Sequence, residues 1–135
     1  MNWERFKTEA DALEYIQTTK GINTAQAKKY LRANLPKEAY YQEKIIKHIR
    51  ELIPSAFVWK AAAGPYSRGG IPDICAIVNG HFYAFEVKRP FVGVISPLQA
   101  QTIKRINAQG GRAHVVTYPD EVTEILREEI DHDND

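Results

Sequence analysis

The chain has 135 residues, 44% of them apolar and 26% charged, which fits one globular domain with a modest core. Its one cysteine, Cys75, excludes an internal disulfide, and its four histidines lack the spacing of zinc ligands. No apolar run approaches the roughly 20 residues needed to cross a bilayer, and no signal-peptide pattern opens the chain. The sequence therefore predicts a protein of the cytoplasm, without membrane contact.

Charge is distributed unevenly along the chain. The net charge is only +1, but residues 119–135 hold eight acids and one arginine, so residues 1–118 carry 17 basic and 9 acidic side chains. Within 44–112 there are ten basic residues and three acids, Glu51, Asp73 and Glu86. A local basic field is the expected footprint of DNA binding. The alternative is a solvated surface whose charges cancel on average.

Two helices are expected first in the chain, over 3–18 and 24–34, the second ending before Pro36. A helix-turn-helix for DNA is one interpretation of this pair. Packing or contact between two copies of the chain is the favoured one, because the lysines and arginine of 24–34 fit an ordinary solvated face. A third helix is predicted over 38–53, with a stripe of isoleucines and leucine, and Pro54 ends it.

A strand over 56–62 is expected next, and it includes Lys60. The glycine-rich loop 63–70 then leads to Asp73, and its Ser67 and Arg68 are candidates for contact with DNA phosphate. The glycines could equally be ordinary turn chemistry. The loop lacks the Gly-Lys-Ser/Thr of a P-loop, so no nucleotide cofactor is expected.

Two short apolar segments, 74–78 and 82–87, flank Asn79-Gly80, which is the strongest short signal for a two-residue type I′ hairpin. If Val78 pairs with His81, the register continues to place Asp73 opposite Glu86. Opposed side chains lie about 5 Å apart, and like charges so placed destabilise a sheet. A function is therefore expected to explain the acidic pair.

Glu86 and Lys88 lie two residues apart and share a face of the strand, on the same side as Asp73. Two carboxylates beside an ammonium group predict a site for a hard divalent cation, Mg²⁺ or Mn²⁺, whose other ligands are water and phosphate oxygens. The alternative is that Lys88 only neutralises an exposed acidic pair.

The remaining elements are a helix from Pro97 to about Gln109, a strand over 112–118 and a helix over 119–130 followed by a frayed acidic tail. Ser96 is the expected N-cap of the first, and Gln99 lies in its first turn. The order α-β-β-β-α-β from 38 to 118 predicts an α/β fold with a mixed sheet and helices on its faces.

The motifs of this segment resemble those of a nuclease family. Ile71-Pro72-Asp73 followed by Glu86-Val87-Lys88 looks like the PD-(D/E)-x-K signature. Together with Gly70-Ile-Pro-Asp73, Phe85-Glu-Val-Lys88 and Ser96-Pro-Leu-Gln99, it is similar to the VRR-NUC (virus-type replication-repair nuclease) family, whose compact members are often phage-encoded. The resemblance covers about residues 40–118. It implies a restriction-endonuclease-like core, which gives a helical appendage at 1–36 and a nuclease domain at 37–135.

The resemblance also implies roles for individual residues. Asp73, Glu86 and the main-chain carbonyl of Val87 would hold the metal, and Lys88 would position the attacking water. Glu43 would be the further acid of the first helix, with Glu38 as the fallback and an ordinary ion pair with Lys47 as the alternative. Gln99 would orient Lys88 or the water.

The activity implied is a Mg²⁺- or Mn²⁺-dependent endonuclease that hydrolyses DNA, acts on branched, flapped or junction substrates, works as a homodimer and resides in the cytoplasm of a bacterium or phage-infected cell. Lys60, Ser67, Arg68 and Arg89 are the expected contacts to DNA. The competing hypotheses are a DNA-binding module that has kept a nuclease fold without catalysis, and a restriction-type or recombination-junction endonuclease.

Overall fold

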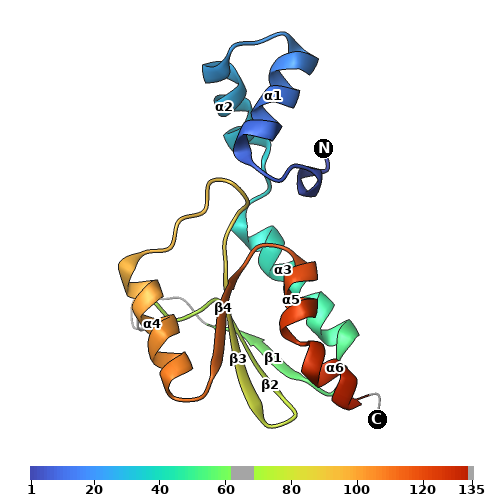
Figure 1. Ribbon diagram of the computed structural model, residues 1–135, viewed down its shortest axis with the longest axis vertical. Helices are drawn as coiled ribbons and strands as arrows, with labels where there is room; N and C mark the ends of the chain where they lie inside the picture. The colour runs from blue at the N-terminus through green and yellow to red at the C-terminus, as the bar shows by residue number, and fades with distance from the viewer. Residues whose placement is uncertain (62–68, 134–135) are drawn as a thin grey trace.

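The computed structural model describes residues 1–61 and 69–133, and Figure 1 shows a small helical unit above a sheet with helices on both faces. The helical unit consists of a 3₁₀ turn, Trp3–Arg5, and two helices, α1 (Glu9–Lys20) and α2 (Thr24–Asn34). The prediction of one helix over 3–18 is wrong at its start. Thr8 has extended backbone and its hydroxyl accepts the N–H of Asp11, so the helix begins at an N-cap that interrupts the predicted span.

Four strands form one mixed sheet in the order β1-β2-β3-β4. They are β1 (Phe57–Lys60), β2 (Ile74–Val78), β3 (His81–Val87) and β4 (Arg112–Val116). The pairs β1·β2 and β2·β3 are antiparallel, whereas β3·β4 is parallel. The parallel pair is possible because a helix, α4 (Pro97–Ala108), makes the crossover between β3 and β4.

The hairpin has the register that its turn predicts. Asn79 and Gly80 both have positive φ, 50° and 82°, as a type I′ turn requires. The pairs run from Val78↔His81 to Ile74↔Phe85. Beyond the last pair, the N–H of Val87 donates to the Asp73 carboxylate at 2.8 Å, which brings Asp73 beside Glu86.

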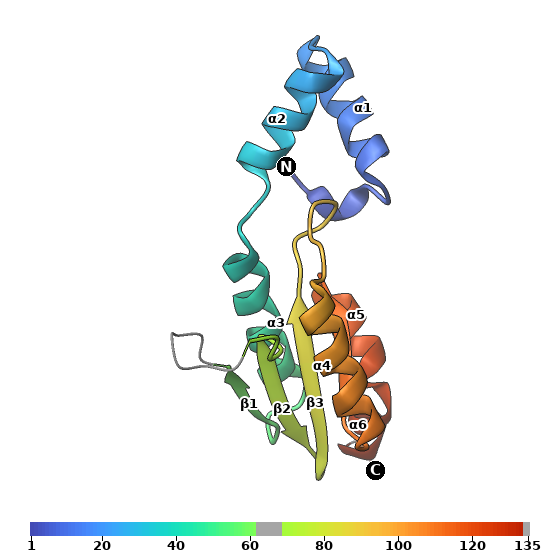
Figure 2. The same ribbon diagram turned by 90° about the vertical axis from the view of Figure 1, so that its left-hand side faces the viewer.

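Helices cover the two faces of the sheet (Figures 1 and 2). On one face, α3 (Glu38–Leu52), α5 (Pro119–Ile125) and α6 (Arg127–Asp133) enclose the main core, whose largest members include Tyr83, Phe85 and Ile45. On the other face, α4 lies over a smaller cluster, Cys75, Ala84 and Ala113. The predicted helix 119–130 is in fact two helices that meet at Leu126, and α6 continues to Asp133, so residues predicted to fray are helical.

The α/β fold with a mixed sheet and an added N-terminal helical unit is thus confirmed. That unit has its own core, which includes Trp3, Ile16 and Leu31, and the core continues onto Phe91 and Val92 of the segment that follows β3. No helix among the described residues is both long and apolar enough to span a membrane.

Candidate metal centre

Three carboxylates meet at the end of the sheet from which β3 leads toward the N-terminal unit. One oxygen each of Glu38, Asp73 and Glu86 lie within 4.8 Å of one another, and we call these three residues the carboxylate cluster. Asp73 directly precedes β2, Glu86 is the second last residue of β3, and Glu38 is the first residue of α3. The hairpin register and the start of one helix therefore bring together residues 38, 73 and 86.

Glu86 lies deepest in the carboxylate cluster and is only 1% exposed. Its Oε1 accepts a hydrogen bond from Gln99 Nε2 at 2.8 Å and lies 3.4 Å from Lys88 Nζ. Its Oε2 is buried and has no hydrogen-bond partner among the described residues. A buried carboxylate oxygen without a partner destabilises the fold. A metal cation bound among the three carboxylates would give this oxygen a partner.

The electrostatics of the cluster favour a bound cation. Burial, then the charge of Asp73, raises the pKa of Glu86 to about 7, while Lys88 acts in the opposite direction. One ammonium group therefore does not compensate the acids. The set of oxygen donors, the unpartnered Oε2 and the repulsion between the carboxylates fit a hard divalent ion such as Mg²⁺ or Mn²⁺.

Gln99 has a more definite place than the sequence indicated. Its side chain accepts the N–H of Ser96 at 2.9 Å through Oε1 and donates to Glu86 through Nε2. Ser96 in turn accepts the N–H of Gln99, which completes a capping box. Gln99 was expected to orient Lys88 or a water, but in the structure it fixes Glu86, because the cap of α4 aims its amide at that carboxylate.

The structure does not bring Glu43 to the carboxylate cluster. Glu43 is exposed, whereas Glu38, the fallback candidate, lies in the cluster. The helical phase explains the difference, because Glu38 lies seven residues before the fully buried Ile45 and thus on the same face of α3. The role of Glu43 as the further acid of the first helix stays a prediction, and the phase of the apolar stripe favours Glu38.

Gln42 is a polar residue of the site that the sequence patterns did not single out. It is buried, and its Nε2 donates to Glu38 Oε1 at 3.4 Å, one turn along α3. A glutamine among the isoleucines of a helix stripe is the signal that could have identified it, since a buried amide needs a polar partner.

The four predicted DNA contacts have different outcomes. Lys60 is exposed at the end of β1. It pairs with Ile74 of β2, the residue that follows Asp73. Arg89 is instead engaged within the protein, where its guanidinium donates to the carbonyls of Pro36, Leu35 and Arg32. These bonds connect the segment after β3 to the C-terminal end of α2, so a contact of Arg89 with DNA stays a prediction that its observed partners do not favour. Ser67 and Arg68 lie outside the described residues.

Comparison with known proteins gives the same fold family as the motifs. A solved structure described as a VRR_NUC domain is similar to this chain, with a TM-score of 0.56 and 23% identity over 67% of this chain and 94% of that one. No protein-family model matches the sequence, and no curated protein matches it. The fold is therefore that of a VRR_NUC domain, which confirms at the level of fold the resemblance seen in the motifs.

Proposed function

We propose that the protein is a divalent-metal-dependent deoxyribonuclease that hydrolyses phosphodiester bonds. The observation that supports this most is the carboxylate cluster, in which Glu86 is buried with one unpartnered oxygen and has Lys88 beside it. A purely structural role would not require three acids whose oxygens lie within 4.8 Å of one another. The fold that this chain shares with a VRR_NUC domain adds support.

In this proposal Glu38, Asp73 and Glu86 hold Mg²⁺ or Mn²⁺, together with the main-chain carbonyl of Val87. The ion, when bound, supplies a water of lowered pKa and neutralises charge on the phosphate. Asp73 is held in place by the N–H of Val87, and Glu86 by Gln99. Lys88 is 15% exposed, so its ammonium group reaches the cluster from a largely desolvated position and can stabilise developing anionic charge.

Hydrolysis would add water to phosphorus and break one ester bond, leaving 5′-phosphate and 3′-hydroxyl ends. We also propose that the enzyme acts on branched, flapped or junction DNA and works as a homodimer. Phe57 and Ile77, a cross-strand pair that is 67% and 45% exposed, provide an apolar surface suited to contact between two copies.

The decisive experiment incubates the purified protein with labelled linear, nicked, flapped and four-way DNA in Mg²⁺, Mn²⁺ or EDTA. Metal-dependent cleavage of any of these substrates supports the proposal. Cleavage that persists in EDTA, or no cleavage in either metal, contradicts it.

The second candidate, a DNA-binding module without catalysis, is tested with Lys88→Ala. We predict that this variant loses cleavage while it keeps most of its DNA affinity, because Lys88 faces Glu86 rather than the outer surface. Binding is measured by fluorescence anisotropy across a salt series, with Lys60→Ala as the control that should weaken binding and flatten its salt dependence. Equal losses of binding in both variants would favour the binding module.

A further inference from the structure

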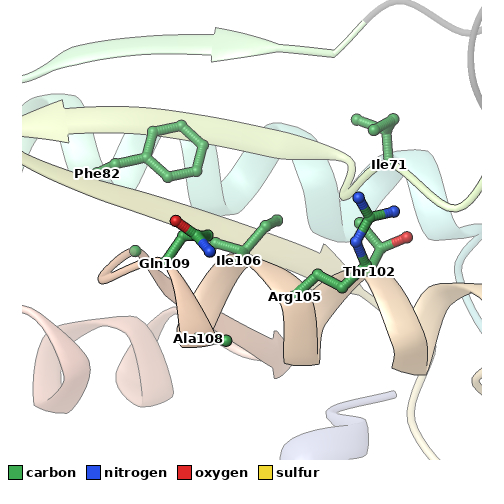
Figure 3. A pocket seen from close by; sticks show the side chains of 8 residues that line it. Ile71, Phe82, Thr102, Arg105, Ile106, Ala108 and Gln109 are labelled. Atoms are coloured by element: carbon green, nitrogen blue, oxygen red, sulfur yellow. The ribbon is translucent and has the colours of Figure 1, made fainter.

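A cavity of about 640 Å³ lies between α4 and the sheet face that this helix covers. Figure 3 shows Phe82 of β3 on one side and Thr102, Arg105 and Ile106 of α4 on the other, with Ile71 near the Thr102 end. A volume of this size is typical of small-molecule sites. The carboxylate cluster does not include any of these residues, so the cavity is a separate feature.

Small side chains line the sheet beneath α4, and Ile103 and Ile106 of the helix pack on them. Cys75, Ala84 and Ala113 are direct neighbours across β2, β3 and β4. No residue of α4 is fully buried. A Cβ at Gly111 would lie 2.5 Å from Ile106, and one at Gly70 would lie 2.7 Å from Leu98, so both glycines allow α4 to approach closely near its ends. The cavity therefore adjoins the interface between α4 and the sheet.

The walls combine an aromatic surface with one positive charge. The Phe82 ring lies 6.5 Å from Trp59, which in turn lies 5.4 Å from Phe57, so an aromatic row leads out of the cavity across β1. Arg105 supplies a guanidinium group, and Thr102 and Gln109 supply polar groups. Lys104 and Arg105 are the charged residues of α4, which contains no acid. Aromatic rings that stack on bases and arginines that pair with phosphate are the recognition chemistry of single-stranded nucleic acid.

The cavity also lies next to the carboxylate cluster. Ile71 is two residues before Asp73, which is about 7 Å along extended chain. Thr102 follows Gln99 by three residues on the same face of α4, about 5 Å along the helix. A phosphate at the carboxylates would therefore have the base of an adjacent nucleotide within reach of the cavity.

We propose that this cavity binds one unpaired nucleobase of the DNA strand whose phosphate lies at the carboxylate cluster. Phe82 stacks on this base, and Arg105 pairs with the phosphate of the same nucleotide, next to the phosphate at the carboxylate cluster. The inference rests on the proposed function and adds to it the residues that would recognise an unpaired base. A paired base would first have to leave its stack, whereas a flap or branch offers an unpaired base without that cost, so the cavity selects such DNA.

The test compares wild type, Phe82→Leu and Arg105→Gln, with Lys104→Gln as the matched control. Lys104 is exposed on the same helix and does not line the cavity, so its variant loses the same charge without altering the site. Binding is measured in Ca²⁺ to flapped DNA with 2-aminopurine at the first unpaired position and to a nicked, fully paired duplex. We expect wild type and Lys104→Gln to prefer the flap and to change 2-aminopurine fluorescence.

Phe82→Leu and Arg105→Gln should each lower that preference about tenfold, the scale of one stacked base, while binding the nicked duplex as Lys104→Gln does. An abasic residue at the probe position should abolish the preference in wild type. Equal preference in all four proteins overturns the inference, as does a Phe82→Leu effect confined to oligomeric mass, which would assign the face to a second copy. If wild type binds with this preference but never cleaves, the cavity stands and the nuclease proposal fails.

Discussion

Glu86 is the residue with the least ordinary environment in the described part of the chain. It combines near-complete burial, a raised pKa and one oxygen without a partner. Desolvation is the largest of the effects on its pKa, ahead of the charge of Asp73. The contacts of Gln99 and Lys88 with the other oxygen, Oε1, offset part of the free energy lost by burying Glu86.

The first prediction concerns the repelling acids. Asp73→Asn and Glu86→Gln should each abolish metal-dependent cleavage, and in the absence of metal each should unfold at the same or a higher denaturant concentration than wild type. The reason is that each variant removes one member of a destabilising like-charge pair. Cleavage assays and urea titrations in EDTA check both parts. Wild-type cleavage in either variant would refute the site.

The second prediction separates the two acids of α3. Glu38→Ala should lose cleavage and at least about tenfold in Mn²⁺ affinity by calorimetry, because it removes one of three carboxylates. Glu43→Ala is the control on the same helix and should behave like wild type, since this side chain is exposed and outside the carboxylate cluster. If the two variants exchanged these results, Glu43 rather than Glu38 would be the metal ligand of α3.

At the scale of elements, Glu129 ties α6 to the hairpin. Its Oε2 accepts from Tyr83 at 3.0 Å, lies 2.7 Å from His81 Nδ1 and lies 3.9 Å from Arg112, and the side chain is 2% exposed. Burial alone would raise the pKa of Glu129, but the hydrogen bonds from His81 and Tyr83 outweigh it and lower the pKa. The C-terminal acidic segment is therefore partly built into the fold.

A third prediction follows for pH. Because the folded-state pKa of Glu129 is lowered, ionised Glu129 stabilises the fold above about pH 4.3, the ordinary value for glutamate, and this stabilisation disappears as pH falls through the folded-state pKa. Glu129→Gln should lose about 2 kcal/mol at pH 7 and progressively less in more acidic buffer. Urea titrations at several pH values measure this.

Glu128→Gln is the neighbouring control. Glu128 is 73% exposed and pairs with Arg112 at 3.3 Å, so its loss should change the free energy of unfolding by less than about 1 kcal/mol at any pH. A constant deficit of Glu129→Gln across the pH range would show that the hydrogen-bond acceptor rather than the charge matters at residue 129.

At the scale of the whole molecule, the N-terminal unit lies beyond one end of the sheet (Figure 2). Arg89 donates to three carbonyls at the end of α2, and Phe91 and Val92 pack on the core of the unit. Both links lie between Lys88 and the loop that leads to α4. The boundary near residue 36 remains a prediction.

The fourth prediction tests that boundary with two matched core variants. Ile16→Ala and Ile45→Ala each remove a fully buried isoleucine, the first from the helical unit and the second from the main core. Each should cost about 2–5 kcal/mol. If the unit folds separately, calorimetry should show two unfolding transitions. Ile16→Ala should lower the midpoint temperature of the transition of the helical unit alone, and Ile45→Ala should lower that of the main domain alone. A single transition that moves equally in both variants would indicate one cooperative domain.

Local chemistry allowed the sequence to determine the hairpin and the acids at its end. The Asn79-Gly80 turn fixes the register because its backbone conformation permits one pairing, and strand alternation then places Glu86 and Lys88 on one face. The cap at Ser96 is likewise a local signal. The order of strands and helices followed from hydrophobic pattern alone.

Tertiary structure decided what depends on residues distant in the chain. The packing of α3 on the sheet brings Glu38 to Asp73 and Glu86, and the approach of α2 gives Arg89 its carbonyl partners. The cavity beside α4 is lined by residues of that helix, by Phe82 of β3 and by Ile71 before β2, a combination of distant segments with no local pattern. Turns and caps are written in neighbouring residues, whereas helix phase against a sheet and the spaces between layers depend on how whole elements pack.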